Sequence, residues 1–149
     1  AKISGHYFNS ILASLEAKKG GFDESLLIDS FGNIAEGPGE NIFFVKNKSI
    51  ITPQKGSILP GITRDSIIII AKGIGYKIVE KNIRPTELKN FSEAFFTGTA
   101  VEVNAIGRIN NIKFNGEEEG KTTKKIKNVY LKIVHGEIEK YKKWLDYIK

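Results

Sequence analysis

Short apolar runs, separated by glycine- and proline-containing turns, set the outline of this fold. "NIFFVKN" at 41–47 and "SIITP" at 49–53 predict the two strands of a hairpin. "EAFFTGTA" at 93–100 predicts a buried strand that ends in a tight turn, and "VEVNAIGRI" at 101–109 predicts the strand after it. These runs predict a domain in which strands outnumber helices.

Three further segments extend this pattern. "ESLLIDS" at 24–30 and "NIAEG" at 33–37 are joined by the turn "FGN", which predicts a second hairpin. "YKIVEKNI" at 76–83 predicts another strand, and "PTELKN" at 85–90 predicts a helical turn. Because hairpins combine with one or two crossover connections, the sequence predicts a single domain of the α+β class.

The first predicted helix lies near the start of the chain. "ILASLEAKK" at 11–19 has apolar residues at helical spacing. Asn9 or Ser10 can cap its beginning, and the pair Gly20 and Gly21 is a suitable end.

The four consecutive isoleucines at 67–70 are ambiguous, because β-branched residues favour strands. We nevertheless expect a helix that begins near Thr63, since Thr63 can cap it and Asp65 lies near the positive end of the helix dipole. Gly73 and Gly75 are then in place to end it.

The C-terminal segment 121–149 has nine lysines and three acidic residues, so it accounts for the whole net charge of +6. Its apolar residues follow each other at intervals of three and four, which predicts one amphipathic helix with a break near Gly136. The lysines then form a solvated face. A basic nucleic-acid-binding module is the alternative, although only three arginines are present to read phosphates or guanines. The apolar residues are Ile126, Val129, Tyr130, Ile133, Val134, Ile138, Tyr141, Trp144, Leu145 and Ile148.

Composition excludes several classes of site. The chain lacks cysteine, which rules out disulfides, a thiolate nucleophile and a cysteine metal site. Its only histidines, His6 and His135, lie far apart in sequence, so we expect no metal. No apolar run approaches the roughly 20 residues that span a bilayer, and we expect a cytoplasmic location without membrane contact. Met is absent even at position 1, which indicates a processed chain or a fragment of a longer protein.

The turn "EGPGEN" is unusual because it places Glu36 and Glu40 in a rigid turn that leads straight into an apolar strand. Two other glycine-containing turns follow, "LPGITRD" and "FFTGTA". Gly61 allows close backbone approach, and the N–H groups of Ile62 and Thr63 would project from a helix N-terminus, which suits an anion such as phosphate. Each turn alone also fits an ordinary cap or surface turn. Their order and spacing together favour a site.

These strings resemble the fold-type IV pyridoxal-phosphate enzymes, and among them the branched-chain amino acid aminotransferases. The resemblance covers essentially all 149 residues and corresponds to the larger, C-terminal domain of that family, beginning one residue before its catalytic lysine. It implies mixed and antiparallel sheets that form a pseudo-barrel with flanking helices. It also implies that the family's small N-terminal domain is missing from this chain. The matching strings are "KISGHYFNSILASLEAKKGGFDESLLID", "GNIAEGPGENIFFVKN", "TPQKGSILPGITRDSII", "EAFFTGTAVEV" and "HGEIEKYKKWLDYI".

The resemblance assigns roles around the cofactor ring. It implies that Lys2 is the catalytic lysine, which binds the cofactor aldehyde covalently and moves the proton. Tyr7 is similar to the tyrosine that hydrogen-bonds the phenolic oxygen of the cofactor. Glu36 is similar to the glutamate that contacts the pyridine nitrogen and keeps it protonated. Leu59 is similar to the apolar residue packed on the face of the ring.

The phosphate of the cofactor would lie at the second turn. The resemblance implies that the N–H groups of Ile62 and Thr63, beside Gly61, bind it, and that the hydroxyls of Thr63 and Thr99 add donors. The family's phosphate-binding arginine comes from the missing domain. Arg64 is therefore interpreted as a structural ion-pair partner.

The third turn would serve both the cofactor and the substrate. Gly98 and Thr99 are implied as cofactor-binding residues, and the Thr99–Ala100 backbone resembles the turn that takes the α-carboxylate of the substrate. Glu40 and Asn41 are interpreted as braces of their own turn and are given no chemical role.

The activity implied is transfer of an amino group between Leu, Ile or Val and 2-oxoglutarate. Alternatives of the same fold are a D-amino acid transaminase or an aminodeoxychorismate lyase, which depart from "EGPGEN" and "FFTGTA". The partners implied are amino acid and 2-oxo acid substrates, the missing domain and further copies in a homo-oligomer. Little activity is expected from this chain alone.

Overall fold

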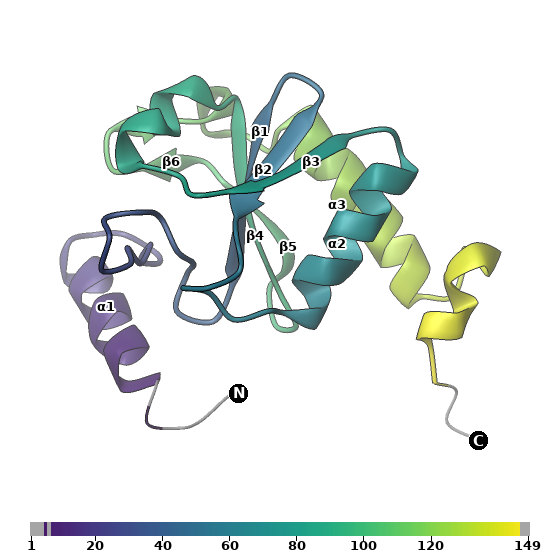
Figure 1. The fold of residues 1–149 in the computed structure, drawn as a ribbon, viewed down its shortest axis with the longest axis horizontal. Helices are drawn as coiled ribbons and strands as arrows, with labels where there is room; N and C mark the ends of the chain where they lie inside the picture. Colours follow the sequence, from purple (N-terminus) through teal and green to yellow (C-terminus); the bar gives the residue numbers. More distant parts are fainter. Residues whose placement is uncertain (1–4, 6, 147–149) are drawn as a thin grey trace.

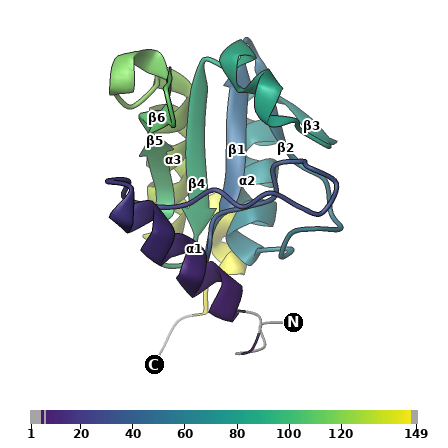
Figure 2. The ribbon, with the colours of Figure 1, turned by 90° about the vertical axis from the view of Figure 1, so that its left-hand side faces the viewer.

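The computed structural model describes residues 5 and 7–146 and has the α+β class expected from the sequence. A five-stranded sheet forms its centre. Helices α2 (Ile62–Gly73) and α3 (Lys121–Val134) lie side by side against one face of this sheet, and α1 (Tyr7–Lys19) lies on the other side (Figures 1 and 2).

The central sheet is mixed, with the strand order β3-β2-β1-β4-β5. Strand β1 is antiparallel to both β2 and β4, β4 is antiparallel to β5, and β2 is parallel to β3. The predicted mixed sheet with flanking helices is therefore confirmed, and in the described part of the chain the sheet is open at β3 and β5 rather than closed into a barrel. The strands are β1 (Asn41–Lys46), β2 (Ser49–Pro53), β3 (Lys77–Lys81), β4 (Glu93–Gly98) and β5 (Glu102–Ile106).

Smaller elements pack around this sheet. The strand predicted at 101–109 divides into β5 and a short β6, which pairs with β7. The helical turn predicted at 85–90 is present as the 3-10 helix η2. The elements are β6 (Arg108–Ile109), β7 (Ile112–Lys113), η2 (Pro85–Asn90), η3 (Asn115–Glu117) and η4 (Glu139–Trp144).

Helix α2 makes the crossover between the parallel strands β2 and β3. It includes the four isoleucines, which form a helix against their local preference for strands. Ile67 and Ile70 are completely buried, whereas Ile69 is half exposed. Burial of one helix face therefore outweighs the β-propensity of these residues, which spans only about 1 kcal/mol.

Apolar side chains cover both faces of the sheet, which explains why β1 is apolar at nearly every position. Phe43 and Val45 pack with Phe95 under α2 and α3, and the rings of Phe43 and Phe95 stack at 5.2 Å. Ile42 and Phe44 point to the opposite core, where Phe44 stacks on Phe91 at 4.7 Å. Strand β1 is thus fixed from both sides.

Three local expectations are corrected by the structure. The hairpin predicted at 24–37 forms without regular strands. Its two halves pair through the antiparallel bridge between Ile28 and Ile34 and through backbone hydrogen bonds from the Leu27 N–H to the Glu36 carbonyl and from the Ala35 N–H to the Leu27 carbonyl, each 2.9 Å. Ile34 turns inward and packs on the sheet. Helix α1 begins at Tyr7 rather than at a cap near Ser10. Helix α2 has Gly61 at its N-cap without a side-chain cap, so Thr63 does not cap it.

The lysine-rich helix ends where its glycine predicts. Helix α3 stops at Val134, Gly136 adopts a positive φ of 77°, and the chain continues as η4. At the other end of α3 the buried Glu93 of β4 acts as the cap. Its carboxylate accepts hydrogen bonds from the N–H groups of Thr122 and Thr123 at 3.0 and 2.8 Å, and from the Thr123 hydroxyl at 2.7 Å.

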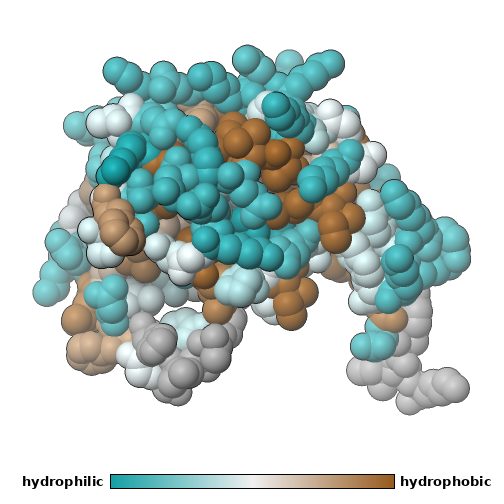
Figure 3. Space-filling model, viewed as in Figure 1, coloured by the Kyte–Doolittle hydropathy of each residue, from teal (hydrophilic) through white to brown (hydrophobic). Residues whose placement is uncertain are grey.

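Helix α1 contributes no buried residue to the described core. Its apolar side chains are instead at the surface, as Figure 3 shows over this helix; Phe8 is 66% exposed, and Ile11, Leu12 and Leu15 are at least half exposed. None of the helices in residues 7–146 has the length and apolar character to cross a membrane.

The Glu93 cap yields a stability prediction. Glu93→Ala should lower the free energy of unfolding by about 2–3 kcal/mol, because two backbone donors at the start of α3 lose a charged acceptor. Urea unfolding measures this, with the exposed Glu118→Ala as the control, for which a change within about 0.5 kcal/mol is expected. Equal stabilities of the two variants would show that the cap contributes nothing.

Candidate active site

The turn that precedes β1 is closed by its own backbone. The Gly37 N–H donates to the Glu40 carbonyl at 2.7 Å, and the Gly39 N–H donates to the Glu40 carboxylate at 3.1 Å. A Cβ at Gly37 would lie 2.6 Å from that carboxylate and 3.0 Å from the Phe96 ring of β4. A side chain at this position would displace the Glu40 carboxylate or the Phe96 ring, so Gly37 lets the turn lie close to the sheet.

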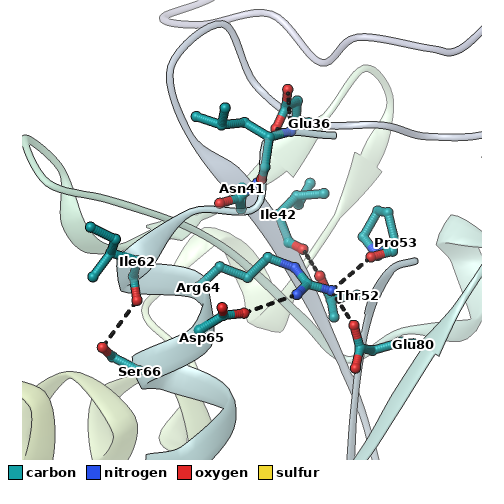
Figure 4. A network of polar contacts seen from close by, with 11 residues as sticks. Glu36, Asn41, Ile42, Thr52, Pro53, Ile62, Arg64, Asp65, Ser66 and Glu80 are labelled. Carbon is teal, nitrogen blue, oxygen red and sulfur yellow. Dashed lines mark hydrogen bonds and ion pairs between the residues drawn. The ribbon is translucent and has the colours of Figure 1, made fainter. Parts of the chain in front are cut away.

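Glu36, at the beginning of this turn, is half-buried and joins two loops. Its carboxylate accepts hydrogen bonds from the Leu59 N–H at 3.0 and 3.1 Å and from Asn41 Nδ2 at 2.9 Å. Figure 4 shows Glu36 and Asn41 close to the first turn of α2. The acid is therefore oriented by fixed donors rather than free in solvent.

Burial controls the charge of this acid. Burial raises the pKa of the Glu36 carboxyl above its usual value, the Leu59 N–H opposes this rise, and the nearby negative charge of Glu40 adds to it. A carboxylate in this condition gains from a cationic partner, because the partner compensates the charge that burial disfavours.

A cavity of about 380 Å³ lies in front of Glu36. Tyr7 of α1, Glu36 and Leu59 all line it, so the structure brings together three residues that the sequence assigned to one ring. The loop at 56–60 and the 37–40 turn form the rest of the wall. The volume lies within the usual 300–1,000 Å³ of small-molecule sites.

Gly61, the N-cap of α2, follows directly after Pro60, which lines this cavity. The first intrahelical bond runs from the Asp65 N–H to the Gly61 carbonyl, at 3.1 Å. The N–H groups of Ile62 and Thr63 come before that bond and have no acceptor within the helix. Ile62 is 87% exposed, so this end of α2 lies at the surface, and N–H groups at a helix N-terminus suit an anion.

Other predicted residues do not line the Glu36 cavity. The buried Thr63 side chain lines a second cavity of about 460 Å³ together with Tyr130 of α3. Thr99 and Ala100 are exposed in the turn between β4 and β5. Gly98 approaches the 36–41 turn, since a Cβ there would lie 3.2 Å from the Gly39 carbonyl oxygen. The roles of these residues stay predictions.

Lys2 and His6 lie outside the described residues. Arg64 is inside them and is fully buried, with an ion pair to Glu80 at 2.6 Å and a hydrogen bond to the Pro53 carbonyl at 3.0 Å (Figure 4). This agrees with its interpretation as a structural partner.

The sequence did not reveal the second hydrogen-bond partner of the Asn41 side chain. Asn41 was interpreted as a brace of its own turn, but its amide also donates to the Leu59 carbonyl at 2.9 Å and so ties this turn to the loop before α2. The motif "EGPGEN" indicated its position, whereas its second partner is 18 residues away. Among the described residues, no group of three or more His, Asp or Glu is placed to hold a metal ion.

The arrangement is suited to a planar ligand that has a basic ring atom and an anionic end. The Glu36 carboxylate can pair with a protonated ring nitrogen, the Tyr7 hydroxyl can hydrogen-bond a ring oxygen, and Leu59 offers an apolar contact. The free N–H groups at the tip of α2 can take the anionic end.

Comparison with known proteins establishes the family. The model of the family described as "Amino-transferase class IV" matches residues 1–109, and the chain belongs to that family.

The relatives are aminotransferases. The branched-chain-amino-acid aminotransferase of Pseudomonas aeruginosa is 42% identical over 149 residues, which cover 100% of this chain and 48% of that protein. The probable branched-chain-amino-acid aminotransferase of Aquifex aeolicus is 44% identical over 146 residues, 97% of this chain and 47% of that protein. The chain thus spans about half the length of these relatives.

Solved structures of such enzymes have the same fold. The branched-chain amino acid aminotransferase from Thermobaculum terrenum, in its PLP form, superposes with a TM-score of 0.94. It is 35% identical, and the match covers 97% of this chain and 48% of that one.

The raised pKa of Glu36 gives a pH prediction. The neutral acid is the form that folding favours, so wild-type stability relative to Glu36→Gln is greatest at low pH and falls as pH rises through the folded-state pKa. Urea unfolding of both proteins between about pH 4 and pH 7 should show this decline. A difference that grew with pH would mean that hydrogen bonding outweighs burial at this site.

Proposed function

We propose that this chain is the C-terminal, cofactor-binding domain of a branched-chain aminotransferase. The whole protein would move an amino group between Leu, Ile or Val and 2-oxoglutarate and would use pyridoxal phosphate. The observation that supports this proposal most directly is that Tyr7, Glu36 and Leu59 line one cavity. The chain that contains them is 42% identical to a branched-chain-amino-acid aminotransferase.

The residues present fit this cofactor. Glu36, held by the Leu59 N–H and Asn41, would pair with the pyridine nitrogen and keep a proton on it. Tyr7 would hydrogen-bond the phenolic oxygen, and the N–H groups of Ile62 and Thr63 would bind the phosphate. When bound, pyridoxal phosphate supplies a ring that takes up the electrons released at the α-carbon of the substrate.

The remaining roles follow from the same assignment. Lys2 would attach the cofactor and move the proton at the α-carbon, two roles that a neutral lysine amine can take. The Thr99–Ala100 backbone would bind the substrate carboxylate. Gly98 would let this turn approach the cofactor, in keeping with its closeness to Gly39.

We also propose the setting of the whole protein. The coverage of about half of each relative supports a further, N-terminal domain in the same protein, beside this one. The exposed apolar side chains of α1, among them Phe8 and Leu15, support an assembly in which they are covered, with a homo-oligomer included. We place the protein in the cytoplasm.

The cofactor assignment is tested by titrating pyridoxal phosphate into the intact protein that carries this chain. A visible absorbance band is expected in the wild type and in Lys18→Ala, a matched control on the exposed end of α1, and it should be absent in Lys2→Ala. An identical band in Lys2→Ala would remove Lys2 from its role, and absence of any band in the wild type would overturn the assignment.

Product analysis with the same protein distinguishes the activity. Amino transfer from L-leucine to 2-oxoglutarate with L-glutamate as product supports the branched-chain reaction. A D-amino acid product, or pyruvate released from aminodeoxychorismate without an amino acceptor, would instead place the protein with the other activities of this fold.

A further inference from the structure

Asn41 lies where the acidic turn, the loop before α2 and the first turn of that helix meet. It is the first residue of β1, is 5% exposed, and is paired in register with Thr97 of β4. Since β1 packs between two apolar cores, the Asn41 backbone belongs to a strand that is held on both faces.

Both N–H bonds of the Asn41 amide are used. Nδ2 donates to Glu36 Oε2 at 2.9 Å and to the Leu59 carbonyl at 2.9 Å. An aspartate would have the same shape but could donate neither bond when ionised, and a serine could donate only one. The two contacts therefore require an amide of this length.

The other end of the amide faces the start of α2. A Cβ added at Gly61, the N-cap of that helix, would overlap Asn41 Oδ1. The absence of a side chain at Gly61 thus lets the helix approach Asn41. One side chain contacts the acid, the loop and the helix tip, as Figure 4 illustrates for Glu36, Asn41 and α2.

We propose that Asn41 is a positioning residue that sets the Glu36 carboxylate relative to the N-terminus of α2. It thereby fixes the spacing between the group that pairs with the cofactor ring and the donors that bind its phosphate. This inference rests on the proposed cofactor, and it assigns to Asn41 a role that acts through Glu36 and not by contact with the reacting atoms.

The physical reason is the small number of restraints on Glu36. Within the described residues its carboxylate has two hydrogen-bond donors, the Leu59 N–H and Asn41. Loss of Asn41 leaves the carboxylate free to rotate about the remaining donor, and it also releases the loop that carries that donor. Binding of a rigid ligand at two points loses affinity when the two points can move independently.

The test measures the pyridoxal phosphate dissociation constant of the intact protein, from its absorbance band, across a pH series. Asn41→Asp should bind at least about tenfold more weakly, as expected when a charged group loses a hydrogen bond. A second carboxylate beside Glu36 also raises its pKa, so the pH at which binding reaches half its maximum should move upward. The other titratable groups that line the cavity, Tyr7 and Glu40, are unchanged.

Two further variants separate positioning from stability. Asn41→Ser keeps one donor and should also weaken binding about tenfold, without the shift in pH; it decides the question alone if Asn41→Asp does not fold. Thr52→Val is the control, because it removes a buried hydrogen bond to the Ile42 carbonyl beside Asn41 and does not contact Glu36. It should lose stability in urea and keep wild-type affinity.

The results that would overturn the role of Asn41 differ from those that would overturn the cofactor assignment. Wild-type affinity and pH dependence in both Asn41 variants would overturn the positioning role while leaving the cofactor assignment intact. Equal loss of affinity in Thr52→Val would show that Asn41 acts only through stability, which would also overturn the proposal. A wild type without a lysine-dependent band is a failure of the proposed function instead.

Discussion

The burial of β1 on both of its faces is the constraint on which the rest of the structure depends. Phe43 packs under the helices and Phe44 packs into the opposite core, so the strand can neither slide nor rotate. Asn41 begins this strand, and the turn with Glu36 precedes it directly. The polar site is therefore attached to a strand that is packed on both of its faces, which holds the backbone next to Glu36 in place.

Two glycines bring the turn before β1 and the first turn of α2 close to their neighbours, and this close packing forms the site. Gly37 lets the acidic turn lie against β4, and Gly61 lets the first turn of α2 lie against Asn41. Each glycine occupies a place where a methyl group would meet a fixed neighbour. The carboxylate of Glu36 and the free N–H groups of α2 consequently stand at a distance set by these close contacts, which suits recognition of one rigid molecule at two points.

Local chemistry in the sequence was enough to predict much of the fold. Apolar runs bounded by turns predicted β1, β2 and β4. Asp65 near the helix start and Gly73 and Gly75 at its end favoured a helix from near Thr63 over the strand that the isoleucines suggest. The hairpin expected at 24–37 is reduced to one bridge and a few backbone hydrogen bonds, because the Ile34 N–H bonds to the Ile83 carbonyl and the Ile34 side chain packs into the core. Burial against residues far away in the chain leaves no pattern in the local sequence. The structure of such a segment therefore cannot be predicted from that segment alone.

The candidate site divides in the same way. By itself the sequence determined which chemical groups are available and in what order, because motifs such as "EGPGEN" and "LPGITRD" are contiguous. Only the tertiary structure decided which side chains face one another. It set Tyr7 and Leu59 beside Glu36, and it turned Thr63 toward Tyr130. Side-chain direction follows from packing between elements far apart in the chain, and sequence spacing carries no record of that packing.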